Sequence, residues 1–139
     1  MLNARVTHVR GLQFVGQAPS GHAIVMDGDT SAGGHDTAVR PSELLLLAIG
    51  GCSGMDIISV LKKKRQDVSG FEIQVQGEKA EDYPKKFTVI TLEYVVRGRN
   101  ISEDAVKKAI ELSMNKYCSV KATLEGSAKI SFSYRIIQE

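Results

Sequence analysis

The chain has 139 residues, of which 42% are hydrophobic and 24% are charged, so its composition is that of an ordinary globular protein of about one domain. A formal net charge of +2 with scattered basic residues argues against a nucleic-acid surface. Because no apolar run approaches the roughly 18–20 residues that span a membrane, and the N-terminus lacks the apolar segment of a secretory signal, we expect one soluble, cytoplasmic domain over residues 1–139 without a membrane partner.

The first third of the chain predicts short strands. Residues 2–9, 12–17 and 22–26 are rich in strand-forming residues, and turn signals separate them at hairpin spacing. A three-stranded meander fits this pattern. The glycine-rich polar segment 28–37 has neither a helical nor a strand period, so it predicts a loop long enough to have a functional role.

Pro41 begins a predicted long helix that runs to about Arg65. Its first turn contains Glu43 and its end contains the basic residues 62–65, which is the usual charge asymmetry of a helix. Residues 44–49 are apolar on every side, whereas a helix packed against one sheet needs only an apolar stripe. The sequence therefore implies a second packing surface for this helix.

The second half predicts strands around one more helix. Alternation over 71–79 and 87–97 predicts two paired antiparallel strands, and a last strand is expected over 127–137. The expected inward residues of the second strand are Ile90, Leu92, Tyr94 and Val96. Ser102 is the expected cap of the helix. Its predicted buried stripe runs toward Cys118 through Val106, Ile110, Met114 and Tyr117.

Two cysteines, Cys52 and Cys118, have surroundings that indicate chemistry. Cys52 lies in the long helix among Gly50, Gly51 and Gly54, each of which costs about 1 kcal/mol relative to alanine. Close approach of another helix or room for a substrate beside the sulfur would explain these glycines. Cys118 lies where the second helix should end.

The spacing of the thiols limits their chemistry. It excludes a local CxxC pair and a zinc knuckle, because two thiols without a nearby pair of histidines cannot fill a tetrahedral site, so we expect no metal. A dithiol formed by the fold remains open. Asp56, four residues after Cys52, is an unfavourable like charge for a thiolate, so activation must come from elsewhere. Arg40 is the best cation in the region, and a Cys/His hydrolase would need His35 held against Cys52.

The segments Pro41–Cys52 and Lys116–Val120 resemble the OsmC/Ohr family of thiol peroxidases, and the expected order of strands and helices is similar over nearly the whole chain. Gly50–Asp56 looks most like the YhfA-like branch of that family. The resemblance implies an α+β, OsmC-like fold, in which antiparallel sheets surround a long central helix in an intertwined homodimer. Such a dimer would explain the all-round apolar helix, and the resemblance implies no bound cofactor.

The resemblance also implies a reaction. Cys52 would attack an organic hydroperoxide and become a sulfenic acid, Cys118 would resolve it as a disulfide, and a lipoyl-type dithiol would reduce the pair. The family's glutamate matches Ser42, whereas Glu43 lies on the opposite face of the helix from Cys52 at about 100° per residue. The family's arginine has no clear match. We predict Arg40, Ser42 and Glu43 as substrate-binding residues.

Two other hypotheses stay open. In one, the chain is a non-peroxidase dimer that binds or senses a small apolar or thiol-reactive molecule. In the other, it is a structural dimer with inert, packed thiols. The distance between the Cys52 and Cys118 sulfurs is the observation that best separates these hypotheses, since a bridge requires close Cα atoms.

Overall fold

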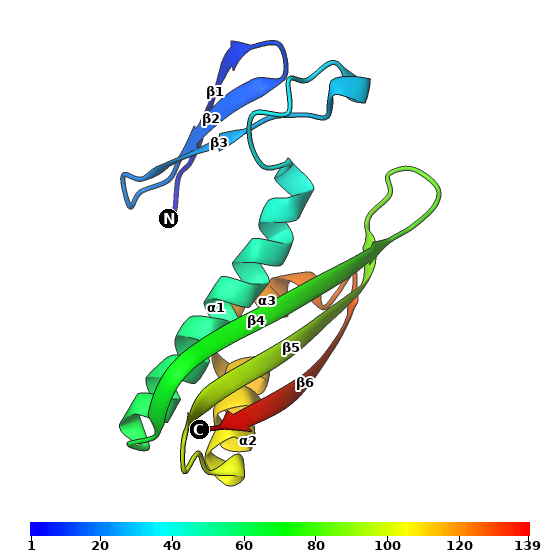
Figure 1. Cartoon of the computed structure of the whole chain (residues 1–139). Coiled ribbons are helices and arrows are strands. Elements are labelled where there is room, and N and C mark those ends of the chain that lie inside the picture. Colours follow the sequence, from blue (N-terminus) through cyan, green and yellow to red (C-terminus); the bar gives the residue numbers. More distant parts are fainter. The chain divides into compact units, whose positions relative to one another are not determined.

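A computed structural model describes residues 1–139 (Figure 1). The chain forms two compact units, Met1–Leu45 and Leu46–Glu139. The first five residues of the long helix α1 (Pro41–Lys63) belong to the first unit, and the rest of α1 belongs to the second.

The first unit is built on a three-stranded antiparallel sheet. Its strands β1 (Arg5–Arg10), β2 (Gln13–Gln17) and β3 (Ala23–Met26) are ordered β1-β2-β3. Gly11 at the first turn has φ 53° and Gly21 at the second has φ 83°, a left-handed conformation that glycine adopts without strain. The predicted meander is therefore confirmed.

The glycine-rich segment after β3 is an ordered loop that includes the 3₁₀ turn η1 (Thr30–Ala32). Asp27 is 2% exposed and organises this loop. Its carboxylate accepts the Gly28 backbone N–H at 2.7 Å, the Thr37 hydroxyl at 2.6 Å, and the backbone N–H groups of Thr37 at 3.1 Å and His35 at 3.3 Å. The Thr37 hydroxyl contributes most to lowering the pKa of Asp27 to about 2, against the effect of burial. The loop is thus held by one ionised carboxylate.

The second unit contains a three-stranded sheet of order β4-β5-β6, with helices on one of its faces (Figure 1). In chain order after α1 its elements are β4 (Asp67–Lys79), β5 (Phe87–Arg99), α2 (Glu103–Leu112), the π-helical turn η2 (Ser113–Tyr117), α3 (Ser119–Leu124) and β6 (Lys129–Gln138). The predicted antiparallel pairing of β4 and β5 is confirmed. The Ser102 side chain caps α2 as predicted, by accepting the Ala105 N–H.

The expectation of purely antiparallel sheets is wrong for the second sheet. Strand β6 pairs in parallel with β5, in a register that runs from Val89 opposite Lys129 to Gly98 opposite Gln138. The helical segment between the two strands carries the chain back to the end where β5 began, and such a crossover joins parallel strands. The sheet is therefore mixed.

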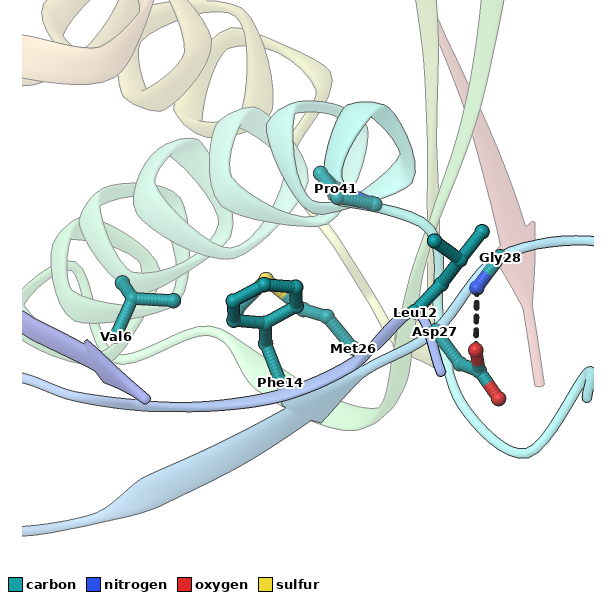
Figure 2. A pocket seen from close by; sticks show the side chains of 7 residues that line it. All are labelled: Val6, Leu12, Phe14, Met26, Asp27, Gly28 and Pro41. Atoms are coloured by element: carbon teal, nitrogen blue, oxygen red, sulfur yellow. Dashed lines mark hydrogen bonds between the residues drawn. The ribbon is translucent and has the colours of Figure 1, made fainter. Parts of the chain in front are cut away.

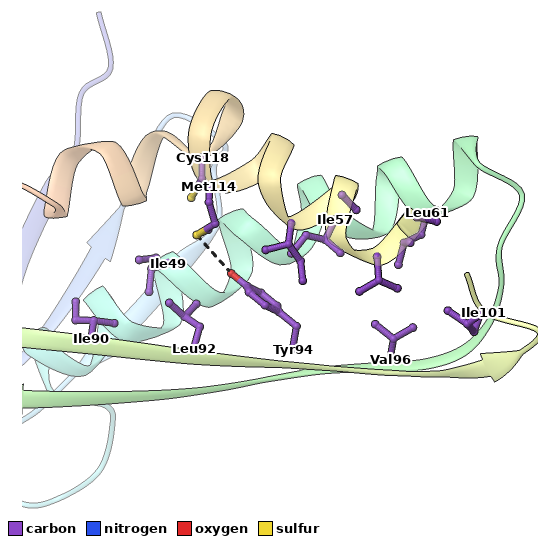
Figure 3. Close-up of a cluster of buried hydrophobic side chains, with 14 of the residues drawn as sticks. Ile49, Ile57, Leu61, Ile90, Leu92, Tyr94, Val96, Ile101, Met114 and Cys118 are labelled. Carbon is purple, nitrogen blue, oxygen red and sulfur yellow. Dashed lines mark hydrogen bonds between the residues drawn. The ribbon is translucent and has the colours of Figure 1, made fainter. Parts of the chain in front are cut away.

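The core of the second unit lies between its helices and the sheet (Figure 3). The four residues of β5 that were predicted to face inward are fully buried: Ile90, Leu92, Tyr94 and Val96. The stripe on α2 is confirmed through Met114, but Tyr117 is 51% exposed, so its predicted burial is wrong. The π-helical turn η2 adds a residue to that turn and rotates Tyr117 out of the stripe.

By length and composition alone, helix α1 is long and apolar enough to cross a membrane. This differs from the sequence-based expectation that no segment of the chain is apolar over such a length. The small residues of α1 break such a run without making the segment polar. Ile49, Ile57 and Leu61 are fully buried in the core, so α1 is a core helix. Leu47 and Met55 are 60% and 73% exposed, which leaves large apolar side chains uncovered on α1.

Candidate functional site

Glycines beside Cys52 allow α1 to lie close to the sheet. A Cβ atom added to Gly50 would lie 3.1 Å from Val75 Cγ2, and one added to Gly54 would lie 2.7 Å from Ile73 Cδ1. These two glycines therefore accommodate strand β4, and not another helix as the sequence suggested.

Gly51 differs from its neighbours. A Cβ atom added at this position would meet nothing within 4 Å. Gly51 is exposed and directly precedes Cys52, which is itself partly exposed. No close packing partner therefore explains Gly51, and room for a substrate near Cys52 stays a prediction at this one position.

The π-helical turn η2 positions Cys118. The Cys118 backbone N–H donates to the carbonyl of Ser113 at 2.8 Å, which closes the wide turn. Cys118 is also the N-cap of α3, and its sulfur accepts the Lys121 backbone N–H at 3.4 Å. The residue that ends one helix therefore begins the next, and its buried sulfur lies at the junction.

The fold brings three reactive groups together. The sulfurs of Cys52 and Cys118 and a carboxylate oxygen of Asp56 all lie within 4.8 Å of one another. Cys52 and Asp56 are one turn apart on α1, so they share a helix face. The Ser113 hydroxyl donates to Asp56 Oδ2 at 2.9 Å and fixes the carboxylate. The fold therefore pairs the two thiols, a possibility that the sequence could not decide, and it places the Asp56 carboxylate beside them.

The two thiols have opposite pKa shifts. Burial raises the pKa of Cys52, but hydrogen bonds from the Val120 backbone N–H, the Cys118 thiol and the Ser119 hydroxyl outweigh it, so this pKa lies below its ordinary value of 9.0. Burial raises the pKa of Cys118 to about 11, although the Lys121 N–H opposes this. Cys52 is therefore the thiol that ionises first.

Asp56 acts against both thiolates. Its negative charge raises the pKa of Cys52 and of Cys118, as the sequence predicted for Cys52. The groups that lower the pKa of Cys52 are the neighbouring thiol and the start of α3. No arginine or lysine is among them, so activation comes from hydrogen bonds.

A buried polar pair supports the site from the core. The Tyr94 hydroxyl donates to Ser53 Oγ at 2.8 Å and approaches Met114 Sδ at 3.9 Å (Figure 3). Ser53, next to Cys52 in the chain, donates to the Ile49 carbonyl at 2.7 Å. Burial raises the pKa of Tyr94 to about 12, so this side chain stays neutral near pH 7. The network fixes α1 against the sheet beneath the thiols.

The other predicted site residues belong to the first unit. The Arg40 guanidinium forms an ion pair with Asp36 at 2.8 Å and donates to the Ala38 carbonyl at 2.9 Å. The Glu43 carboxylate accepts the Arg40 backbone N–H at 2.7 Å, as a residue in the first turn of a helix commonly does. Ser42 lies half-buried between them. These contacts of Arg40 and Glu43 thus stabilise the start of α1, and their role in substrate binding stays a prediction.

A Cys/His hydrolase would need His35 as its base. Its ring packs against Gly11, where an added Cβ atom would lie 3.2 Å from the imidazole, and its backbone N–H donates to Asp27. These contacts belong to the ordered loop of the first unit. They give His35 a structural role.

Each of the two units has a hollow on its surface. In the first unit, a hollow of about 450 Å³ is lined mainly by Val6, Leu12, Phe14 and Met26, and Figure 2 shows the Asp27 carboxylate bonded to Gly28 beside it. Its lining has no nucleophile or cation. In the second unit, a groove of about 560 Å³ includes Asp56 of the thiol cluster. Its other lining residues include Met55, Val60, Lys63, Leu112 and Tyr117.

Sequence reasoning missed part of the cluster. The sequence places the charge of Asp56 near Cys52, but it predicts neither the proximity of Asp56 to Cys118 nor the hydrogen bond from Ser113. Helical spacing could have placed Asp56 on the Cys52 face. No sequence pattern marks the π-helical turn that brings Ser113 and Cys118 to the same place.

Known proteins share this arrangement of elements. Residues 34–133 match the family described as OsmC-like protein. The chain is 43% identical over 136 residues to Protein YhfA of Escherichia coli strain K12, with 98% of each chain covered. It resembles the crystal structure of a hypothetical protein from Aquifex aeolicus VF5, with a TM-score of 0.82, 32% identity, and 99% of this chain and 98% of that chain covered. An organic hydroperoxide resistance protein from Elizabethkingia anophelis has a similar fold, with a TM-score of 0.69, 13% identity, and 100% and 96% covered.

Proposed function

We propose that this chain, which belongs to the OsmC-like protein family and holds two cysteines side by side, is a thiol-dependent reductase of organic hydroperoxides. The observation that carries this proposal is the distance of at most 4.8 Å between the Cys52 and Cys118 sulfurs. We place this activity in the cytoplasm, in oxidative-stress defence, and we treat residues 1–139 as one OsmC-like domain.

The proposed reaction has three balanced steps. The Cys52 thiolate attacks the terminal oxygen of R–O–O–H, so that the O–O bond breaks, Cys52 becomes a sulfenic acid and R–O⁻ leaves and takes up a proton. The Cys118 sulfur then attacks the Cys52 sulfur, which forms a disulfide and releases water. A lipoyl-type dithiol reduces this disulfide and is itself oxidised to a disulfide. The lower pKa of Cys52 supports its assignment as the first nucleophile.

The surroundings of the cluster support an organic substrate. The groove that Asp56 lines has apolar side chains such as Val60 and Leu112 alongside the charged Lys63 and Lys64. Gly51, which directly precedes Cys52, has no close packing partner. The apolar side chains of this groove would contact the organic group of an alkyl hydroperoxide, which hydrogen peroxide lacks. Alkyl hydroperoxides should therefore be preferred. The substrate-binding roles of Arg40, Ser42 and Glu43 remain proposals that rest on the resemblance.

The decisive experiment combines turnover with thiol mapping. Reduced protein should consume an alkyl hydroperoxide with a lipoyl-type dithiol in the steady state, and a single addition of peroxide should give an intramolecular disulfide. In Cys118→Ser, the product should stop at a sulfenic acid on Cys52 that a dimedone-type reagent labels. Labelling of Cys118 in Cys52→Ser at the same rate would reverse the assignment, and unreactive thiols in the folded protein would remove it.

The chain is proposed to act as an obligate homodimer. Leu47 and Met55 on α1 are large apolar side chains that are more than half exposed, and isolated soluble chains seldom tolerate such patches along a helix. Sedimentation at low micromolar concentration should show a dimer and no folded monomer. A stable folded monomer under those conditions would contradict the intertwined fold.

One observation favours a second function. The charge of Asp56 acts to raise the pKa of both thiols, although hydrogen bonds keep that of Cys52 below its ordinary value, whereas rapid peroxide reduction needs a thiolate. The alternative is a dimer that binds or senses a small apolar or thiol-reactive molecule through the same cysteines. Stoichiometric oxidation of Cys52 without steady-state turnover would favour this sensor over the enzyme.

A further inference from the structure

We propose that reduced Cys52, Cys118 and Asp56 together form a binding site for a thiophilic divalent cation of the zinc type. The inference uses the residues of the thiol cluster but does not depend on peroxide reduction. It differs from the zinc knuckle excluded by the cysteine spacing, because a knuckle is a closed site with four protein ligands.

The ligand set fits such an ion. Two thiolates and one carboxylate offer two sulfurs and one oxygen, and sulfur donors favour zinc over magnesium or calcium, which prefer oxygen donors. Three charges of −1 against +2 leave a net charge of −1 at the site. Binding displaces the two thiol protons to solvent, and water fills the fourth position, as in open three-ligand zinc sites.

The geometry requires only small movements. Around a tetrahedral zinc ion with Zn–O bonds of about 2.0 Å and Zn–S bonds of about 2.3 Å, neighbouring ligand atoms lie about 3.5–3.8 Å apart. The three donor atoms lie within 4.8 Å of one another. Side-chain rotations that shift these atoms by about 1 Å would therefore bring them to the distances of a zinc site. Cys52 and Asp56 come from one face of α1, and Cys118 faces them from the start of α3.

A second layer of hydrogen bonds holds each ligand. Ser113 donates to Asp56 Oδ2 at 2.9 Å, Lys121 N–H donates to Cys118 Sγ at 3.4 Å, and Val120 N–H donates to Cys52. Hydrogen bonds of this kind orient metal ligands and are themselves important for affinity. The carboxylate that disfavours bare thiolates thus has a favourable role once a cation is bound.

Metal binding and oxidation exclude each other in this site. A bound cation occupies the sulfur lone pairs that would attack a peroxide, and a Cys52–Cys118 disulfide removes two of the three ligands. The cation therefore inhibits oxidation, and oxidation releases the cation.

Cobalt(II) is the probe for this site, because thiolate ligation gives a charge-transfer absorption that other protein ligands do not. Anaerobic titration of the reduced wild-type protein should saturate this absorption at one ion per chain, and zinc should displace the cobalt. Cys118→Ser should lose about half of the band, and Asp56→Asn should weaken binding about tenfold or more. Asp82→Asn, a change at an exposed turn, should match the wild type.

Wild-type protein in its disulfide form provides a control that needs no substitution, and it should give no band. Absence of the band in reduced wild type at tens of micromolar cobalt would overturn the proposal, as would full binding in the disulfide form or equal affinity in Asp56→Asn. The titration contains no peroxide, so its outcome is separate from that of the proposed enzyme. Metal binding without turnover would remove only the peroxidase, and turnover without metal binding would remove only this site.

Discussion

Two aspartates of this protein illustrate how the surroundings of a carboxylate decide its role. Asp27 accepts hydrogen bonds from three backbone N–H groups and one hydroxyl, and its pKa falls to about 2. Asp56 accepts one hydroxyl and faces two thiols. The first is satisfied by its own loop and holds the backbone. The second directs its charge at other titratable groups, which is typical of a functional site.

The largest expected effect comes from substituting the two cysteines that Asp56 faces. Cys52→Ser should reduce peroxide consumption to the background rate, because the attacking sulfur is gone. Cys118→Ser should still react once with peroxide but should not complete the catalytic cycle without an added thiol. Stopped-flow and steady-state peroxide assays of the two variants measure these effects. Equal single-turnover rates in Cys52→Ser and the wild type would show that the cluster is not the site of attack.

Asp27→Asn tests the structural carboxylate. We expect a lower melting temperature at pH 7, because the amide cannot serve all the donors that face Asp27. The pKa of Asp27 is lowered in the folded state, so its stabilising contribution is present above the ordinary value of 3.8 and is lost as the pH falls toward about 2. Thermal unfolding between pH 7 and pH 2 should therefore show the two proteins converging. A difference that stays constant over this range would contradict the role of the charge.

Asp56→Asn tests the carboxylate of the cluster. Removing its charge should lower the pKa of both thiols, so more Cys52 thiolate is present near neutral pH. Alkylation of Cys52 by iodoacetamide should be several-fold faster, an effect of the size expected for one partly screened charge. Asp82→Asn is the matched control at an exposed turn. A slower reaction in Asp56→Asn would show that the carboxylate instead helps to deprotonate the thiol.

The smallest expected effects are on stability, and they distinguish Gly51 from Gly54, the two glycines that flank Cys52 and Ser53. Gly51→Ala should stabilise α1 by up to about 1 kcal/mol, because nothing lies near the added methyl group. Gly54→Ala should be about 1–3 kcal/mol less stable than Gly51→Ala, since its methyl group would press against the Ile73 side chain. Urea unfolding measures both. A raised KM in the stable Gly51→Ala variant would indicate that substrate uses this space, and an unchanged KM would contradict that use.

The sequence by itself determined the elements whose signals are local. Period-two alternation located β4 and β5, helical spacing and the Ser102 cap located α2, and Pro41 with its acidic first turn located the start of α1. Strand β4 nevertheless begins at Asp67, before the alternation used to predict it. The segments around the two cysteines were also enough to identify the family, which the matched residues 34–133 confirm.

Only the tertiary structure decided how the two thiols meet. Cys52 and Cys118 are far apart in the chain, so no local pattern fixes the distance between their sulfurs. A π-helical turn, which depends on a backbone hydrogen bond and has no sequence signature here, aims Cys118 at Cys52 and rotates Tyr117 outward. The parallel pairing of β6 likewise follows from the path of the crossover. Local residue patterns select elements, whereas packing and long-range hydrogen bonds select which side chains share a site.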